Sequence, residues 1–198
     1  MIDYIKGEIT ELNPTYAVVE TAGVGYFINI ALPTYSALNG KKTCKLFVHE
    51  AIREDAYNLF GFVNQVEREL FLLLISVSGI GPNTGRMIMS SYEAAEIQQM
   101  IATGNAVALN TINGIGPKTA QRIIIELKDK IIKLNIESAL DLTAQPQHQL
   151  SNETRQEAVS ALVMLGFSTN VAQKAVDAVL KTQPDMHVEQ LIKLALKN

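Results

Sequence analysis

The sequence of 198 residues contains little of several residue types that would point to particular functions. It has one cysteine, Cys44, and no tryptophan. A single cysteine excludes an intramolecular disulfide framework and a cysteine-rich metal site. No run approaches the roughly 18 apolar residues of a membrane-spanning helix, and the first residues lack the basic and apolar segments of a signal peptide. We therefore expect a soluble, cytoplasmic protein with no membrane partner.

A strong excess of one charge is also absent. The chain has 17 basic and 20 acidic residues, which gives a net charge of −3. This balance argues against a protein that binds nucleic acid through its overall charge, although it allows local DNA contacts. Hydrophobic residues make up 47 % of the chain, which is enough for a buried core. The length fits one large domain or two or three small ones.

The first third of the chain has the pattern of β structure. Short runs rich in β-branched and aromatic residues alternate with turn signals such as Asn39-Gly40. The runs cover residues 4–9, 16–21, 26–30, 45–49 and 57–60. Five short strands in so few residues favour a small closed or nearly closed barrel over residues 1–63, because closure removes exposed sheet edges.

From Asn64 onward the pattern is helical. Asn64 and Glu67 have the spacing of a capping box, in which asparagine replaces the usual serine or threonine. Apolar residues at helical spacing then predict helices over residues 66–77, 84–89, 92–102, 106–110 and 119–134. We therefore expect a helical domain over residues 64–134.

The last part of the chain divides into a linker and a small bundle. Residues 135–151 lose strong periodicity and gather glutamine, serine and asparagine, which predicts a flexible linker with room for a brief helix around 136–142. Beyond it, three short helical patterns over 153–165, 170–181 and 188–197 predict a three-helix bundle in residues 152–198.

The most informative feature is an internal repeat. The segment SGIGPNT at 78–84 recurs 35 residues later as NGIGPKT at 113–119. Two glycines around an apolar residue allow a tight turn whose backbone can approach a ligand. Proline at the start of the next helix needs no N–H partner, and the free N–H groups of the first turn attract an anion. An anion that recurs along a polymer strand is phosphate.

Other interpretations of these glycines fit less well. A nucleotide-binding Walker loop needs Gly-Lys-[Ser/Thr], but Pro117 separates Gly116 from Lys118. A dinucleotide-binding fingerprint follows a strand, whereas these glycines follow helical patterns. The remaining alternative is a corner between two helices that binds no ligand, and two copies with matched flanks favour DNA binding over it.

At this point the sequence resembles helix-hairpin-helix DNA-binding modules, and its order of parts resembles the RuvA family. The local motifs that agree are Gly23-Val24-Gly25-Tyr26, Arg53-Glu54-Asp55-Ala56, Leu59-Phe60-Gly61-Phe62 and Leu165-Gly166-Phe167. The resemblance covers nearly the whole chain. It implies a multidomain protein, β and then α: an OB-type β-barrel, a domain with two helix-hairpin-helix motifs, a flexible linker and a three-helix, UBA-like bundle.

The resemblance implies a homotetrameric platform that carries an open, square-planar four-way DNA junction, with tetramer or octamer on DNA left open. The residues that would contact the DNA backbone are Gly79, Gly81, Arg86, Gly114, Gly116, Lys118 and Arg122. Asn83 occupies the position where many relatives carry lysine, and Arg86 would compensate from the next turn. A solvated surface lysine remains the alternative for Lys118.

The resemblance also gives a role to Arg53, Glu54 and Asp55. On sequence alone, two adjacent carboxylates on a turn indicate a solvated hairpin. In RuvA-like proteins the matching acidic pair forms a pin that repels phosphates at the centre of the platform, and Arg53 would guide a strand. No catalytic or metal-binding constellation is visible, since the three histidines fall in three different segments. We therefore expect a non-enzymatic subunit without a cofactor.

The resemblance assigns the bundle to partner binding. It implies that Leu162, Leu165, Phe167 and Leu196 contact a RuvB-type hexameric ATPase, and that a RuvC-type resolvase is a further partner. Core packing is the alternative for each of these apolar residues. The expected function is to bind four-way (Holliday) junctions and recruit the motor for branch migration in recombination and repair. The rivals are a DNA-processing enzyme with the same modules and an adaptor that binds only protein.

Overall fold

The computed structural model describes residues 1–143, 149–182 and 186–196. They fall into two compact units, Met1–Asn135 and Ile136–Asn198. The centre of the predicted linker, including Pro146, lies outside the described residues. In the described part of the chain no helix is long and apolar enough to cross a membrane.

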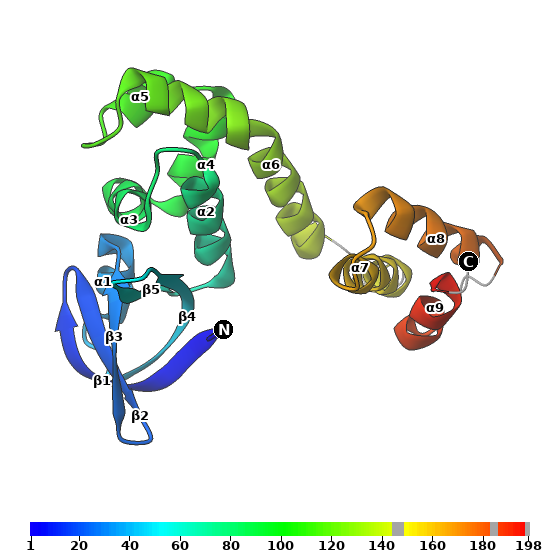
Figure 1. The fold of residues 1–198 in the computed structure, drawn as a ribbon, viewed down its shortest axis with the longest axis horizontal. Coiled ribbons are helices and arrows are strands. Elements are labelled where there is room, and N and C mark those ends of the chain that lie inside the picture. The colour runs from blue at the N-terminus through cyan, green and yellow to red at the C-terminus, as the bar shows by residue number, and fades with distance from the viewer. Residues whose placement is uncertain (144–148, 183–185, 197–198) are drawn as a thin grey trace. The chain divides into compact units, whose positions relative to one another are not determined.

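The first unit begins with a closed five-stranded barrel, as the sequence predicts (Figure 1). Its strands follow one another in space as β1-β2-β3-β5-β4, and only β3 and β5 pair in parallel. Their bounds are β1 (Tyr4–Asn13), β2 (Tyr16–Thr21), β3 (Val24–Ile30), β4 (Thr43–Ile52) and β5 (Tyr57–Phe62). The short helix α1 (Leu32–Leu38) links β3 to β4 and was not predicted, because seven residues are too few to show a helical period.

Among the described residues, five helices begin in the first unit after the barrel, and the last of them continues into the second unit. They are α2 (Gln65–Ser76), α3 (Pro82–Ser91), α4 (Ala94–Thr103), α5 (Ala106–Asn110) and α6 (Pro117–Thr143). Asn64 caps α2 as predicted, since its side chain accepts a hydrogen bond from the Glu67 main-chain N at 2.8 Å. The Glu67 carboxylate accepts instead from the Val63 main-chain N at 3.3 Å, one residue beyond the usual capping-box partner. Helix α6 runs nine residues past the predicted end at 134.

The barrel and these helices share a core at their junction. Phe71 of α2 is fully buried, and its ring packs against Phe60 and Phe62 of β5 at centroid distances of 5.4 and 4.9 Å. The buried residues around it come from four more helices and include Ile88, Ile97, Leu109, Ile123 and Leu127. Because apolar interiors are close-packed, this shared core fixes the helices on the barrel.

After the end of α6, the second unit contains the predicted three-helix bundle. The bundle consists of α7 (Gln149–Met164), α8 (Thr169–Thr182) and α9 (Val188–Ala195), which bury a small core. Arg155 of α7 donates two hydrogen bonds to the Asp177 carboxylate of α8, at 2.6 and 2.9 Å. These bonds hold the pKa of Asp177 below its ordinary value.

Candidate nucleic-acid interface

The two repeated segments fold into turns with the same main-chain hydrogen bonds. The Ile80 N donates to the Val77 O and the Ile115 N to the Ile112 O, both at 3.0 Å. Each following helix starts alike, because Gly81 O and Gly116 O accept from the residue four positions on at 2.9 Å. The sequence repeat is therefore a structural repeat of two helix–turn–helix corners.

One pair of glycines serves the conformation of the turns. Gly79 has a φ of 93° and Gly114 a φ of 85°, in the left-handed region that favours glycine. The next residues, Ile80 and Ile115, are 4 % and 3 % exposed and plug the core between the helices. The left-handed glycine thus lets the chain reverse while the isoleucine anchors the corner.

The second pair of glycines is not needed by the fold. Gly81 has a φ of −87°, and neither Gly81 nor Gly116 lies in the left-handed region. A Cβ added at either position would meet no heavy atom within 4 Å. The missing side chain leaves the main chain open at the N-terminus of α3 and of α6. Since the first N–H groups of a helix and its dipole favour an anion, both corners can hold a phosphate through main-chain donors.

The basic residues near the second corner remain accessible. Lys118 is exposed in the first turn of α6. Arg122, one turn further on, donates from Nη1 to the Ser78 O at 3.0 Å, and its Nε lies 3.9 Å from Glu126 Oε1. Because Ser78 belongs to the first corner, this bond places the two corners side by side.

Arg86 of the first corner has different partners. Its Nη1 donates to the Thr15 O at 2.9 Å and to Asn29 Oδ1 at 3.3 Å, both in the barrel. Burial lowers the pKa of this guanidinium. Asn83 is exposed at the position that Lys118 occupies in the second corner. Lys118 and Arg122 are thus exposed near the second corner, whereas the half-buried Arg86 donates hydrogen bonds from Nη1 to the barrel.

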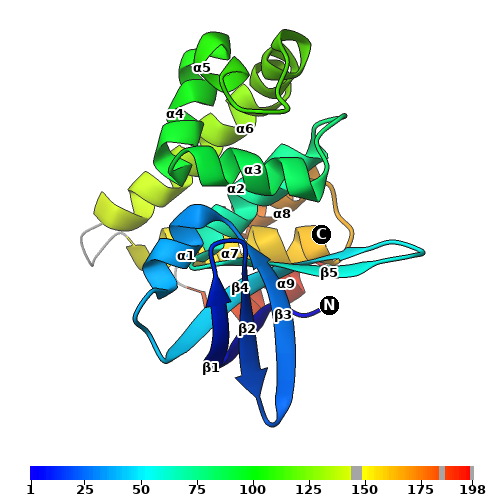
Figure 2. The same ribbon diagram turned by 90° about the vertical axis from the view of Figure 1, so that its left-hand side faces the viewer.

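The three residues of the predicted acidic pin lie together at the turn between β4 and β5. Arg53, Glu54 and Asp55 are all exposed, and the Arg53 N closes the turn by donating to the Ala56 O at 2.8 Å. Figure 2 shows this hairpin projecting from the barrel. The two carboxylates thus stand at the tip of a ribbon rather than on the barrel wall.

Sequence reasoning missed the residue that braces this ribbon. Glu50 of β4 accepts a hydrogen bond from the Tyr57 hydroxyl at 2.5 Å and another from the Ile2 N at 2.8 Å. Both bonds lower the pKa of the Glu50 carboxyl. No local signal marks Glu50, because its partners lie on another strand and at the start of the chain.

The four apolar residues expected to bind a partner separate into two groups. Leu162 is 1 % exposed and belongs to the core of the bundle, so it is not part of a surface and the core alternative applies to it. Leu165, Phe167 and Leu196 are 61, 39 and 45 % exposed. Met164 is 88 % exposed, and sequence reasoning did not single it out.

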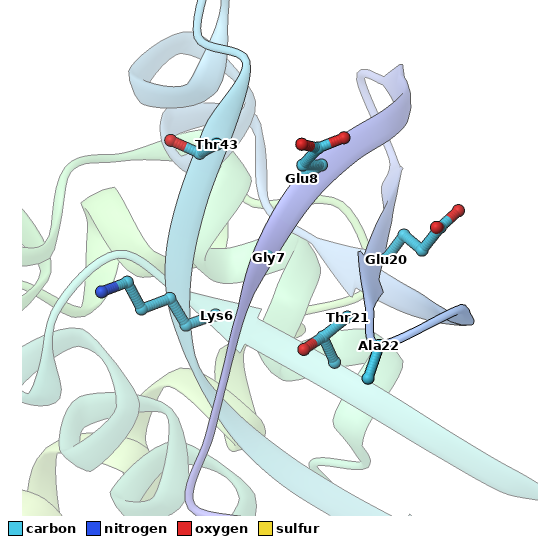
Figure 3. A pocket seen from close by; sticks show the side chains of 7 residues that line it. All are labelled: Lys6, Gly7, Glu8, Glu20, Thr21, Ala22 and Thr43. Atoms are coloured by element: carbon cyan, nitrogen blue, oxygen red, sulfur yellow. The ribbon is translucent and has the colours of Figure 1, made fainter.

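Two other features of the described residues bear on alternative sites. Among these residues no group of three or more His, Cys, Asp or Glu side chains is arranged to hold a metal ion. A pocket of about 540 Å³ lies on the barrel. Figure 3 shows the residues that line it: Lys6, Gly7, Glu8, Glu20, Thr21, Ala22 and Thr43. None of the predicted site residues lines it.

Comparison with known proteins adds independent information about the same regions. Residues 1–61 match the model described as "RuvA N terminal domain", and 153–198 match "RuvA, C-terminal domain". Residues 71–129, which hold both corners, match "SAM-like Helix-hairpin-helix tandem".

Curated relatives match over the full chain. A protein of Bacteroides fragilis is 56 % identical over 200 residues, covering 100 % of this chain and 99 % of its own length. Proteins of Bacteroides thetaiotaomicron and Flavobacterium psychrophilum are 54 % and 46 % identical, with 100 % of this chain covered and 99 and 100 % of theirs. All three are named "Holliday junction branch migration complex subunit RuvA".

Proposed function

This chain belongs to the RuvA family, and from that premise we propose that it binds Holliday junctions as a subunit of a branch migration complex. The observation that carries the proposal is the pair of corners whose open glycines, Gly81 and Gly116, are not required by the fold. Two main-chain phosphate sites side by side fit a continuous DNA backbone and do not fit a single small anion.

The proposed contacts follow from what each corner exposes. The main-chain N–H groups around Gly79, Gly81, Gly114 and Gly116 bind phosphate oxygens. Lys118 and Arg122 add charge-assisted contacts beside the second corner. The first corner binds through its main chain, because Asn83 carries no charge and Arg86 donates to the barrel.

The β4–β5 hairpin with Glu54 and Asp55 at its turn, here called the acidic hairpin, provides selectivity for junctions over duplex DNA. Four copies of Glu54 and Asp55 around the axis of a homotetramer, or eight in an octamer, repel an unbroken backbone and tolerate the open centre of a four-way junction. Arg53 guides a strand past the acidic pair. The exposed turn at the end of a projecting ribbon supports this role, since it places the carboxylates where DNA can meet them.

The C-terminal unit recruits the motor. We assign Leu165, Phe167 and Leu196 to a docking surface for a RuvB-type hexameric ATPase, with Leu162 supporting it from the core. A RuvC-type resolvase is the further partner of the assembled platform. The proposed division is 1–63 for the barrel, 64–134 for junction binding, 135–151 for the linker and 152–198 for motor binding, and the chain itself is non-catalytic.

Binding to a fixed four-way junction and to a duplex of equal length, in metal-free buffer, tests the proposal. We expect a clear preference for the junction and no change in the DNA. Cleavage or other processing of the DNA would support the enzyme alternative. Absence of DNA binding would support an adaptor that binds only protein.

Two altered chains test the roles of the parts. Glu54→Gln with Asp55→Asn should raise duplex binding relative to junction binding, and an unchanged ratio at matched ionic strength contradicts the acidic-pin role. Residues 1–145 should bind junctions but fail to stimulate the ATPase. Full branch migration by this truncated chain would exclude the C-terminal unit as the coupling element.

A further inference from the structure

We propose that Arg86 is a positioning residue: through Asn29 it fixes the acidic hairpin relative to the first corner, and so sets junction selectivity without touching DNA. The inference rests on the proposed function, because it concerns the geometry of the same two contact regions. It assigns to Arg86 a task that differs from the phosphate contact expected from its sequence position.

The first step is a continuous chain of hydrogen bonds. Arg86 Nη1, on α3, donates to Asn29 Oδ1 on β3 at 3.3 Å. The Asn29 side chain then donates from Nδ2 to the Leu59 O on β5 at 3.1 Å. Strand β5 begins at Tyr57, directly after the turn that holds Glu54 and Asp55. A polar connection therefore runs from the helix of the first corner to the return strand of the acidic hairpin.

A second contact holds the same helix on α1, which links β3 to β4 of the barrel. Ser90, one turn after Arg86, accepts a hydrogen bond from the Leu32 N at 3.2 Å and donates to the Arg86 O at 2.8 Å. Arg86 also reaches the Thr15 O at 2.9 Å. Because successive turns of α3 are tied to the barrel and to α1, the rotation and the tilt of α3 are both restrained. Arginine suits this task, since its planar, multi-donor head can serve two fixed acceptors at once.

The second corner shows that this arrangement is not part of the repeat. The residue 35 positions after Arg86 is Gln121, which is exposed on α6. The two corners share their turn geometry. Only at the first corner does an arginine, Arg86, occupy this position, and its hydrogen-bond acceptors lie in the barrel and not in the helices. This half-buried guanidinium donates its hydrogen bonds to neutral oxygens of the barrel.

The test compares three variants of the full chain: Arg86→Met, Asn29→Ala and, at the matched position, Gln121→Met. Junction and duplex affinities are measured over a series of salt concentrations, in the parent and in the Glu54→Gln, Asp55→Asn background. We expect Arg86→Met and Asn29→Ala to lower the junction-to-duplex ratio roughly three- to tenfold, with an unchanged slope of log K against log salt. Gln121→Met should leave the ratio unchanged. In the neutralised background all three variants should show the same ratio.

Two results would overturn the inference. If Arg86→Met lowers the salt slope by about one while Asn29→Ala has no effect, then Arg86 contacts a phosphate. If both variants change the ratio equally with and without the acidic pair, or leave it unchanged, their role is only structural. Should Arg86→Met fail to fold, Asn29→Ala decides alone, since it keeps the charge of Arg86. Failure of the proposed function itself would appear differently, as a parent chain with no junction preference.

Discussion

The first corner, between α2 and α3, and the second corner, between α5 and α6, have the same main-chain hydrogen bonds but different surroundings. The first is held to the barrel through Arg86 and to α1 through Ser90, and it presents the neutral Asn83 beside its turn. The second has no such side-chain bond to the barrel among the described residues, and it presents Lys118. The two corners thus differ in their side chains: the first is anchored by Arg86 and has the neutral Asn83 where the second has Lys118.

The largest expected effect concerns the open glycine that both corners share. Gly81→Val and Gly116→Val, made separately, should each weaken junction binding about tenfold or more, because a side chain keeps phosphate away from charge-assisted main-chain donors. Stability should fall by no more than about 1 kcal/mol, the cost of a poorer N-cap. Lys118→Ala serves as the comparison and should have a smaller effect. Normal junction binding by a folded valine variant would show that the corner concerned does not contact DNA.

The next effect concerns a difference in packing. Position 85 is glycine, where a Cβ would lie 3.0 Å from Ile75 Cγ2 and 3.1 Å from Phe71 Cε2, whereas the matching Ala120 is fully buried. Ala120→Gly should reduce the free energy of unfolding by about 1.5 kcal/mol, through lost helix propensity and a lost buried methyl. Gly85→Ala should change it by only a few tenths of a kcal/mol, because the close contacts offset the gain in propensity. Urea unfolding measures the free energy of unfolding of both variants. An Ala120→Gly variant as stable as the parent would contradict the expected difference in packing between the two corners.

A smaller effect should follow from exchanging the charges. Asn83→Lys should raise junction affinity roughly threefold near 0.1 M salt and steepen the dependence of log K on log salt by about 0.9. Lys118→Asn should change both quantities in the opposite direction. If Asn83→Lys alters neither affinity nor slope, the first corner does not approach a phosphate. Thermal unfolding of both variants serves as the control, since both positions are exposed.

The smallest expected effect is a dependence of stability on pH near the first corner. His49 of β4 packs against Phe71 of α2 with a ring-centroid distance of 5.7 Å, and burial lowers its pKa below the ordinary value near 6.5. The neutral form is thus favoured by folding, so stability is complete above about pH 6.5 and declines as the pH falls towards the folded pKa.

Hydrogen exchange, corrected for intrinsic rates, can detect this decline. Protection of α2 should fall more than protection of α5 and α6 between pH 7.5 and 5.5, because residues 106–143 contain no histidine. His49→Gln should abolish the difference. A difference that survives this substitution would assign the pH dependence to another group.

The features that were predicted from the sequence are those that local patterns determine. The strands, the N-cap at Asn64 and the repeated turns each depend on residues a few positions apart. The partners of Arg86 lie 71 and 57 residues away, and no spacing rule reveals them. Glu50 was missed for the same reason, since it bonds to Ile2, 48 residues away.

The bundle shows a second limit of sequence reasoning. Leu162 and Leu165 lie near the end of the same helical pattern and are equally apolar, yet one is 1 % and the other 61 % exposed. Which of them faces inward depends on where α8 and α9 pack, and the period of one helix does not contain that information. Apolar residues alone therefore could not separate core from docking surface.

The parallel pairing of β3 with β5 has a consequence for synthesis on the ribosome. Strand β3 ends at Ile30, but its partner is complete only at Phe62, after α1, β4 and the acidic hairpin. At about 5–20 residues per second, the edge of β3 waits roughly 2 to 6 s before the strand that covers it has been made. During that interval the growing chain exposes an unpaired strand edge, which can pair with another chain.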